Sequence, residues 1–516
     1  MNRLTRSATN ILASTLGFAG PVLINLVATP LLLRALGQAA YGLSSLVAVL
    51  TGYLAIMDLG LDIPIVKYLA EDYARHDLEA GARLLNTTLK LYLGIGIVGM
   101  AGMVLLSDFL VRHVFRIPPE LSGQATLVFM FSGLGFLGSL LNAWGRAVAN
   151  GVQRYEVSGI VSTAGSILGV ALGLGVVYIG YGVAGYALTR AVILILTGLI
   201  YIAVARRLVA GLRLSFEFDW NVVRRIRSYL GSGIIMRSLS AVSSNMDYTL
   251  ISIWLGVAAL AIYSLPFLLF NNASYLIFTM LNFAFPMSSE LSSSGQIEKL
   301  RDFYARAVRF VAALATMVFV PLLLLGDAFF TIWVGRSFAN QAGTTLHLLL
   351  LSGYVSTLAI TLGSAVAVGT GHIRDYTLYS LLRSAVIVVL CALLIRPLGI
   401  AGAGVAWLAA AGVDVIFQFI VVREYLRMSV WPLMRFAYFK PILLGCAMAL
   451  LSWFIRPFAY SWPGMFAIVG ALEAAYIVAG YRMGIFGETE KRAVLGLWQV
   501  TVGRIAGVMG KVPSQP

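Results

Sequence analysis

Charged side chains are scarce in this chain. Of its 516 residues only 11% are Asp, Glu, Lys or Arg, whereas a soluble domain carries about 25% because water must wet its surface. Hydrophobic residues make up 59% of the sequence, and the mean hydropathy is +0.88. This composition excludes a soluble globular protein and requires most of the surface to face lipid.

Cysteine and histidine are also scarce. The two cysteines, Cys391 and Cys446, lie in apolar runs, where cysteine usually acts as a small buried hydrophobic residue. The four histidines stand apart from one another, so no cluster has metal-ligand spacing. The sequence therefore predicts no metal site, no cofactor and no catalytic residue.

Long apolar runs are what the chain has in abundance. Runs of at least about 18 residues recur from end to end, and each can cross a hydrocarbon core of about 30 Å as a helix. The alternating pattern of a membrane β-barrel is missing, and helices are the other way to satisfy the backbone in lipid. The predicted fold class is an all-α membrane protein with about 14 transmembrane helices, at residues 12–33, 43–63, 87–107, 122–144, 157–179, 183–204, 229–253, 257–282, 307–333, 343–367, 378–396, 399–421, 436–455 and 463–485.

The first run, Leu12 to Leu33, is interpreted as a retained span. It exceeds the apolar region of a signal peptide, about 7–15 residues, and no small-residue cleavage site follows it. The segments between spans are short, which leaves no room for a catalytic domain outside the membrane.

The basic residues predict the orientation. With a cytoplasmic N-terminus, 29 of the 37 Lys and Arg residues fall in inside segments and 6 in outside segments, as the positive-inside rule requires. Both termini are therefore predicted to be cytoplasmic. The net charge of +15 then reflects contact with an anionic leaflet. No base-stacking or groove-reading motif accompanies these residues, so no nucleic-acid partner is expected.

An internal repeat relates the two halves. Three matches occur in order at offsets of 219, 222 and 219 residues: Leu36-Gly37-Gln38-Ala39-Ala40 with Leu255-Gly256-Val257-Ala258-Ala259, Pro64 with Pro286, and the segment Leu78 to Lys90 with Ile297 to Arg309. Because each repeat holds six spans, both halves share one orientation and are related by an axis along the membrane normal. We expect two parallel six-helix bundles around a central cleft, a geometry that suits alternating access.

This repeat predicts three domains. An N-terminal bundle spans residues 1–215, its repeat spans 216–430, and residues 431–516 hold two extra spans and a tail. In the tail, apolar residues at helical spacing alternate with basic ones, which is typical of an amphipathic helix on the cytoplasmic face.

The chain resembles a known family at these positions. The corner Pro30 to Gly42, the run Met57-Asp58-Leu59-Gly60-Leu61, and Asp247 followed by Leu255-Gly256 and Tyr263 are similar to the polysaccharide flippases of the multidrug/oligosaccharidyl-lipid/polysaccharide (MOP) exporter superfamily. The resemblance covers spans 1–12 and extends over the chain. Its motifs are short and identify the superfamily better than the substrate.

Membership would imply a flippase that acts by alternating access. Its substrate would be an undecaprenyl-diphosphate-linked oligosaccharide, moved across the bacterial inner membrane for surface polysaccharide (lipopolysaccharide or exopolysaccharide) biosynthesis. The protein would hydrolyse no ATP, and coupling to H+ or Na+ is common in the family. The expected partners are this substrate, membrane lipids and the polysaccharide biosynthesis machinery, with the protein itself a monomer.

Ionisable residues inside spans are the sharpest clues to a substrate cavity, since each costs about 2.5–3.5 kcal/mol at a helix centre. Arg237 and Arg190 suit a diphosphate, which arginine binds with several donors. Pairing of Arg190 with Asp247 is the structural alternative. Asp247 is a candidate counter-charge or cation ligand, and Asp414 a candidate ion-coupling site. Asn25 and Asn142 are candidates for sugar contacts, with interhelical hydrogen bonds as the alternative.

Five further residues are candidates for a gate or for the path by which the substrate enters: Arg34, Asp58, Asp62, Arg146 and Arg154. Asp58 and Asp62 are expected one helical turn apart on a single face. Their structural alternative is pairing with Lys67 or nearby bases. For the three arginines, the structural alternative is that they only orient the spans in the membrane.

Three other functions stay open. A drug/cation antiporter or a lipid II flippase would belong to the same superfamily, although drug exporters usually stop at twelve spans. A membrane polymerase or ligase would need an acid–base set on a long outer loop. The longest such loop, about residues 108–121, offers Asp108, Arg112, His113, Arg116 and Glu120.

Overall fold

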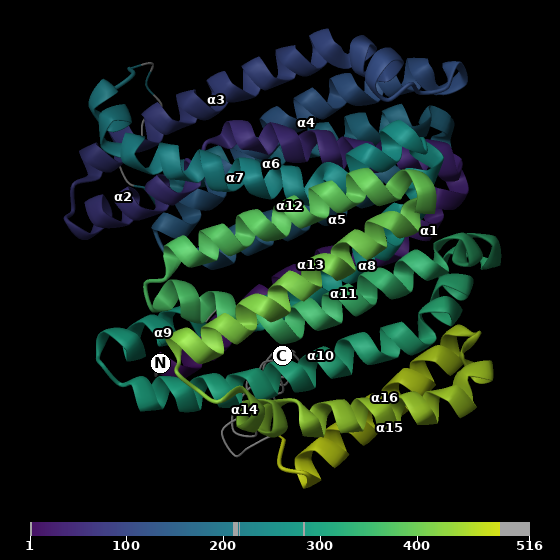
Figure 1. Ribbon diagram of the computed structural model, residues 1–516. Helices are drawn as coiled ribbons and strands as arrows, with labels where there is room; N and C mark the ends of the chain where they lie inside the picture. Colours follow the sequence, from purple (N-terminus) through teal and green to yellow (C-terminus); the bar gives the residue numbers. More distant parts are fainter. Residues whose placement is uncertain (1–2, 210–214, 216, 282–283, 486–516) are drawn as a thin grey trace, which may run out of the picture. The chain divides into compact units, whose positions relative to one another are not determined.

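The computed structural model describes the backbone of residues 3–209, 215, 217–281 and 284–485, and the side chains of these except 3–19, 21 and 228–240. Within those ranges the regular elements are helices, without a strand. The longer helices (Figure 1) are α1 (Arg3–Leu54), α3 (Leu78–Phe109), α4 (Pro119–Gly151), α5 (Tyr155–Val176), α6 (Gly182–Leu208), α7 (Trp220–Trp254), α8 (Val257–Met280), α10 (Ile297–Val334), α11 (Arg336–Gly369), α12 (Ile373–Leu398), α13 (Ile400–Ile420), α15 (Phe439–Ile455) and α16 (Trp462–Arg482). The shorter ones are η1 (Ala55–Asp58), α2 (Asp62–Ala74), η2 (Leu110–Val114), η3 (Val177–Tyr181), α9 (Ala284–Ser293), η4 (Val421–Tyr425), α14 (Val430–Ala437) and η5 (Arg456–Ala459).

These helices confirm a multi-pass α-helical membrane protein. In the described ranges, eleven helical segments are long and apolar enough to cross a membrane. Two of them, Val22–Asp58 and Tyr155–Leu208, each cover two of the predicted spans. The total of fourteen spans and the layout as two bundles remain predictions.

The chain reverses inside α1 at Gly37. This residue has φ 79° and ψ 168°, a conformation that is essentially restricted to glycine. Tyr41 packs against the apolar cluster that contains Ala28 and Leu32, although thirteen residues of unbroken helix would place Ala28 and Tyr41 about 20 Å apart. The two parts of α1 are therefore folded against each other and correspond to the first two predicted spans.

The backbone repeats at the offset found in the sequence. Gly37 and Gly256, 219 residues apart, both have positive φ, 79° and 87°. Two helix boundaries follow the same offset: α2 and α9 end at Ala74 and Ser293, and α3 and α10 begin at Leu78 and Ile297. The matched sequence segments thus adopt matched local structures.

Contacts divide the chain into two compact units. Unit 1 comprises Met1–Leu16, Phe267–Arg383 and Trp407–Pro516, and unit 2 comprises Gly17–Pro266 and Ser384–Ala406. The predicted domain boundaries at residues 215 and 430 remain predictions. Each unit is described by itself below.

In unit 2, a buried core forms where α2, α3, α4 and the start of α7 meet. Ile65, Leu84, Trp144 and Ile226 from these four helices are fully buried in it. Small residues bring α4 and α6 close together, since a Cβ atom on Gly138 would lie 2.8 Å from the Cβ of Leu194. Close helix approach of this kind is how membrane helices gain van der Waals contact.

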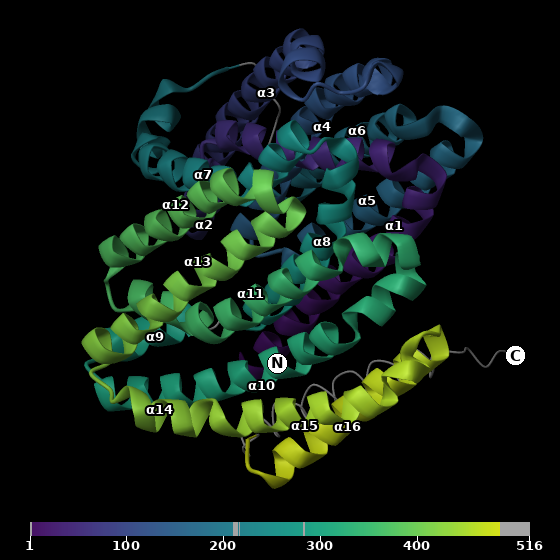
Figure 2. The same cartoon turned by 45° about the vertical axis from the view of Figure 1, so that its right-hand side comes forward.

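In unit 1, α15 and α16 pack against α10 (Figures 1 and 2). Leu325, Met448 and Leu472 join the three helices in one apolar core. Near the turn between α15 and α16, Trp453 and Phe458 are 75% and 73% exposed, as expected for aromatic residues at a membrane interface. The predicted amphipathic tail lies outside the described residues.

Candidate functional site

The connection between α6 and α7 is attached to α3. Three hydrogen bonds hold its described residues: Ser215 N donates to Asn86 Oδ1 (3.2 Å), Asp219 N to Thr87 Oγ1 (3.3 Å), and Lys90 Nζ to the Glu217 carbonyl. The side chains that accept or donate lie on consecutive turns of α3. The first helix of the predicted second half is therefore anchored to the first half through its connecting segment.

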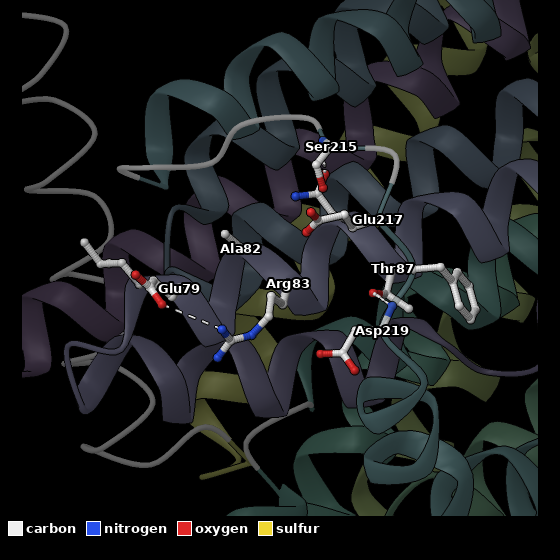
Figure 3. Close-up of a pocket in the computed structure, with 10 residues that line it drawn as sticks. Glu79, Ala82, Arg83, Thr87, Ser215, Glu217 and Asp219 are labelled. Atoms are coloured by element: carbon white, nitrogen blue, oxygen red, sulfur yellow. Dashed lines mark hydrogen bonds and ion pairs between the residues drawn. The ribbon is translucent and has the colours of Figure 1, made fainter.

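A pocket of about 540 Å³ lies beside this connection (Figure 3). Its lining includes the carboxylates of Glu79, Glu217 and Asp219 and the guanidinium of Arg83. Arg83 lies 3.7 Å from Glu79, and both side chains are more than half exposed. With more acidic than basic groups, this pocket does not suit a diphosphate.

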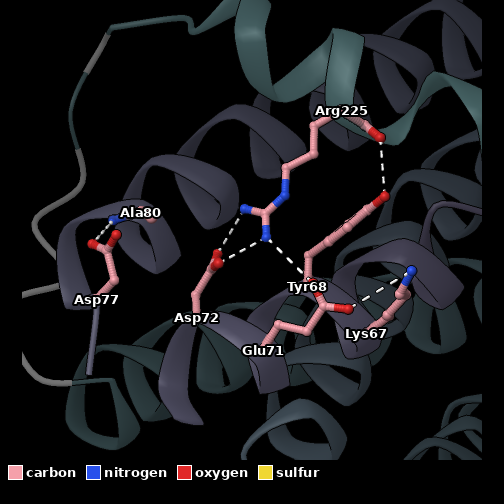
Figure 4. Close-up of polar contacts among 7 residues, drawn as sticks. All are labelled: Lys67, Tyr68, Glu71, Asp72, Asp77, Ala80 and Arg225. Atoms are coloured by element: carbon pink, nitrogen blue, oxygen red, sulfur yellow. Dashed lines mark hydrogen bonds and ion pairs between the residues drawn. The ribbon is translucent and has the colours of Figure 1, made fainter. Parts of the chain in front are cut away.

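A polar cluster joins α2 to the start of α7 (Figure 4). Both terminal nitrogens of Arg225 donate to the two carboxylate oxygens of Asp72, at 3.0 and 2.8 Å. The guanidinium lies 4.3 Å from the ring centre of Tyr68, whose hydroxyl donates to the Arg225 carbonyl at 3.2 Å. The hydrogen bonds that Arg225 donates to Asp72 raise the pKa of Arg225 above its ordinary value. A bidentate, stacked arginine of this kind fixes the geometry of both partners.

Asp247 on α7 forms a buried polar group in unit 2. It is 0% exposed, and its Oδ2 accepts a short hydrogen bond from the hydroxyl of Tyr263 on α8. Its Oδ1 accepts from the backbone N–H of Tyr248 at 2.8 Å. The turn at Gly256 reverses the chain and brings α8 back to this carboxylate. Asp247 and Tyr263, quoted above for the family resemblance, are thus in direct contact.

Asp414 on α13 forms a second buried polar group, in unit 1. Arg383 Nε donates to its Oδ1 at 2.8 Å, and the hydroxyl of Tyr379 donates to the same oxygen at 2.6 Å. Asp414 is 0% exposed, and its Oδ2 has no hydrogen-bond partner among the described residues. A buried carboxylate with one open oxygen can accept a proton or help to bind a cation.

Aromatic rings surround this ion pair. The Arg383 guanidinium lies 5.3 Å from the ring centre of Trp407, within cation–π range. Tyr379 stacks on Phe417 at 4.4 Å. These contacts fix the side chains of α12 against α13.

Among the predicted cavity residues, Arg190 is half-buried on α6. Its Cδ packs over Gly169 of α5, 3.5 Å from where a Cβ atom would lie. It makes no ion pair with the part of the chain that the structure describes, so the alternative of pairing with Asp247 is wrong. Arg237 belongs to α7, but its side chain lies outside the described residues.

The two asparagines differ in their surroundings. Asn142 is 4% exposed, and its amide nitrogen donates at 2.7 Å to the carbonyls of Gly138 and Leu194. One amide hydrogen therefore bonds within α4, and the other joins α4 to Leu194 of α6, which is the interhelical alternative. Asn25 is half-buried on α1.

Asp58 and Asp62 do not share a helical face. Asp58 ends η1 and Asp62 begins α2, and Leu59 and Gly60 between them have positive φ of 55° and 72°. The expectation of one continuous turn was wrong because this left-handed step breaks the helix. The alternative partner, Lys67, lies 3.7 Å from Glu71.

The three arginines proposed for the substrate path are exposed. Arg154 pairs with Glu156, while Arg34 and Arg146 lie on the surface of α1 and α4. The described residues contain no group of three His, Cys, Asp or Glu side chains placed to hold a metal ion.

The sequence reasoning missed two partners. The sequence analysis named neither Arg383, which falls inside the predicted span 378–396, as a partner of Asp414 nor the Arg225–Asp72 pair. One signal was available: Tyr379 and Arg383 are four residues apart, hence on one helical face, on the span preceding the buried Asp414.

Comparison with known proteins identifies a matching family, a relative and solved structures with a similar fold. Residues 31–342 match the model of a family described as "Polysaccharide biosynthesis protein". A Shigella flexneri protein named "Putative O-antigen transporter" is 22% identical over 408 aligned residues, and the alignment covers 76% of this chain and 91% of that protein.

Two solved structures share the fold. A multidrug resistance MATE family transporter of the MOP superfamily, in an inward-facing conformation, has a TM-score of 0.67 at 16% identity and covers 80% of this chain and 96% of its own. The lipid II flippase MurJ, in an inward closed conformation, has a TM-score of 0.68 at 12% identity and covers 92% of this chain and 100% of its own.

Proposed function

Because the chain belongs to the polysaccharide biosynthesis protein family, we propose that it moves a lipid-linked, undecaprenyl-diphosphate oligosaccharide across the bacterial cytoplasmic membrane. The family match carries this proposal and confirms the resemblance predicted from the sequence. The fold shared with MOP superfamily transporters supports a membrane transporter. The product would serve the synthesis of a surface polysaccharide.

Arg190 supports a diphosphate cargo. It is an intramembrane cation that makes no ion pair with the described residues, so its donors are available to an anionic headgroup. Membrane burial of such a group is costly and usually marks a substrate or ion path. Arg237 stays a predicted member of the same cavity.

Alternating access between the two repeated halves is the mechanism that we infer, with both termini on the cytoplasmic side. Asp414 and Asp247 are the proposed coupling sites for H+ or Na+. Asp414 supports this role through its open Oδ2, because protonating it would weaken the pair with Arg383. An ion pair that is either formed or broken can couple ion binding to movement of the helices.

Deletion of the gene tests the function. We expect surface polysaccharide to be lost and lipid-linked units to accumulate on the cytoplasmic side, where a membrane-impermeant glycan-oxidising reagent cannot reach them in intact spheroplasts. Re-expression should restore labelling. Normal labelling of these units in the deletion strain would overturn the proposal.

Two functions within the superfamily are the alternatives, and the fold likeness to a MATE transporter and to MurJ favours each of them. Expression in a drug-sensitive strain would reveal an antiporter as increased drug resistance. Rescue of growth after depletion of the host's lipid II flippase would reveal a lipid II flippase. We expect neither effect.

The contacts of residues 108–121 argue against a polymerase or ligase. This predicted outer segment would have to supply the acid–base residues of such an enzyme. Asp108 is ion-paired with Arg112 at 2.7 Å, and His113 stacks on Phe109 at 5.2 Å. These groups contact their own helical segment and one another. Replacing His113 by Ala should leave polymer length unchanged, and a shortened polymer would favour the enzyme.

A further inference from the structure

Glu473 places a carboxyl group in the middle of α16, one of the two helices added to the repeat. The helix has 21 residues and is therefore about 31 Å long, close to the hydrocarbon thickness of about 30 Å. Glu473 follows Trp462 by eleven residues and precedes Arg482 by nine, so each end is about 14–16 Å away. A glutamate side chain is too short to reach either membrane surface from this position.

No described cation neutralises this carboxyl. Its Oε2 is buried and has no hydrogen-bond partner among the described residues. Four charged residues of α10, α15 and η5 make contacts with other groups: Arg309 stacks on Phe436, Lys440 donates to the Met483 carbonyl, and Asp327 pairs with Arg456. An unpaired carboxylate in an apolar environment is strongly disfavoured, so the group gains a proton instead.

Hydroxyl groups extend from the turn of α16 that follows Glu473 to α11. Tyr476, one turn further along α16, donates to the Ala313 carbonyl of α10 at 3.2 Å, three residues before Thr316 on the same helix. Thr316 Oγ1 lies 2.9 Å from the hydroxyl of Tyr354 on α11. We call these three residues the hydroxyl chain.

We propose that Glu473 is a proton-binding site in the middle of the membrane, neutral in the folded protein and connected to α11 by the hydroxyl chain. The site lies in the appended helices, apart from the candidate cavity and coupling residues. It does not rest on the proposed cargo, because proton binding can be measured without any substrate.

Dicyclohexylcarbodiimide provides the first test. This apolar reagent enters the bilayer and adds to protonated carboxyl groups, giving a stable N-acylurea that peptide mass spectrometry locates. In proteoliposomes of the full chain we expect labelling at Glu473 that falls as the pH rises, and none at this position in E473Q. Glu79, which is 89% exposed, is the control that a water-soluble carbodiimide should label instead.

Infrared spectroscopy decides the case if the reagent cannot reach the group. The wild-type protein should show a carboxylic acid carbonyl band near neutral pH that is missing in E473Q. Identical spectra of the two proteins in this region would overturn the proposal, whatever the labelling shows.

Thr316→Val tests the hydroxyl chain. Losing this polar group should raise the pH at which the Glu473 signal is half lost, since the ionised form is then less well stabilised. Thr331→Val is the matched control, because Thr331 lies on the same helix and donates to the Asp327 carbonyl at 2.7 Å. Equal midpoints in the two variants would show that the chain does not reach Glu473.

Discussion

The hydroxyl of Ser45 donates a hydrogen bond to that of Ser264 across 3.3 Å, and the two residues are 219 positions apart. This separation is the offset of the internal repeat, so each serine contacts its own counterpart. The helices approach closely there, since a Cβ atom on Gly42 would lie 1.8 Å from the Val257 carbonyl oxygen.

A disulfide between these positions is the first prediction. The double variant S45C/S264C should cross-link under mild oxidation, because side chains in contact at this distance have Cβ atoms close to disulfide range. The measurement is mobility on a non-reducing gel after cleavage at a protease site inserted between the halves. Each single variant retains Cys391 and Cys446 and controls for their reactivity. Absence of the cross-linked band would contradict the contact.

The Arg225–Asp72 pair should stabilise the junction of α2 and α7. Removing either side chain should cost about 2 kcal/mol, since the other loses charge-assisted hydrogen bonds. Arg225→Lys should recover only part of this, because an ammonium group can neither bind both oxygens in a planar fork nor stack in the same way. Thermal unfolding in detergent measures the effect. The exposed Arg224→Ala is the control, and an equal loss there would refute a specific role for Arg225.

The Arg383–Asp414 pair should behave as a buried charge pair. Arg383→Ala and Asp414→Ala should each destabilise the protein by about 3–5 kcal/mol, since each leaves an uncompensated charge. The double variant should be more stable than the single variants. Unfolding temperatures of the four proteins give the coupling energy.

The wild type, the two single variants and the double variant also distinguish a structural role of the pair from a role in transport. If Asp414 couples an ion to transport, the stable double variant should fold and yet fail to respond to an imposed ion gradient. Wild-type transport by the double variant would leave the pair with a structural role alone.

Arg190 should matter for cargo and not for folding. We expect Arg190→Ala to lower transport at least about tenfold, equivalent to about 1.4 kcal/mol, with unchanged expression and unfolding temperature. Arg190→Lys should be intermediate, because it retains the charge without the planar fork. Arg207→Ala, at the exposed end of the same helix, is the control. A loss of stability that accounts for the lost transport would argue for helix packing instead.

Much of the candidate site was visible in the sequence because burial of charge in lipid is costly. Asp247 and Asp414 were singled out as charges inside apolar runs, and the structure shows both fully buried. Their partners were less visible. In the sequence, nothing distinguishes Tyr263 from other aromatic residues in the spans. Arg383 is recognised as the partner of Asp414 only when α12 and α13 are seen side by side.

Local rules failed where the chain leaves the helix. Asp58 and Asp62 have the spacing of one helical face, but two residues of positive φ separate them. Asn142 was a candidate sugar ligand, and its amide instead joins two helices. Spacing along a sequence identifies a helical face only if the backbone stays helical. The partner of a side chain on that face depends on which helix packs against it.

The sequence by itself determined that this protein is a multi-pass helical membrane protein with an internal repeat of about 219 residues, because hydropathy and backbone hydrogen bonding in lipid leave few alternatives. Only the tertiary structure decided which buried charges are paired. Arg383 meets Asp414, Arg225 meets Asp72, and Glu473 meets no described cation, since these outcomes depend on which helix faces lie together, information that no single helix carries.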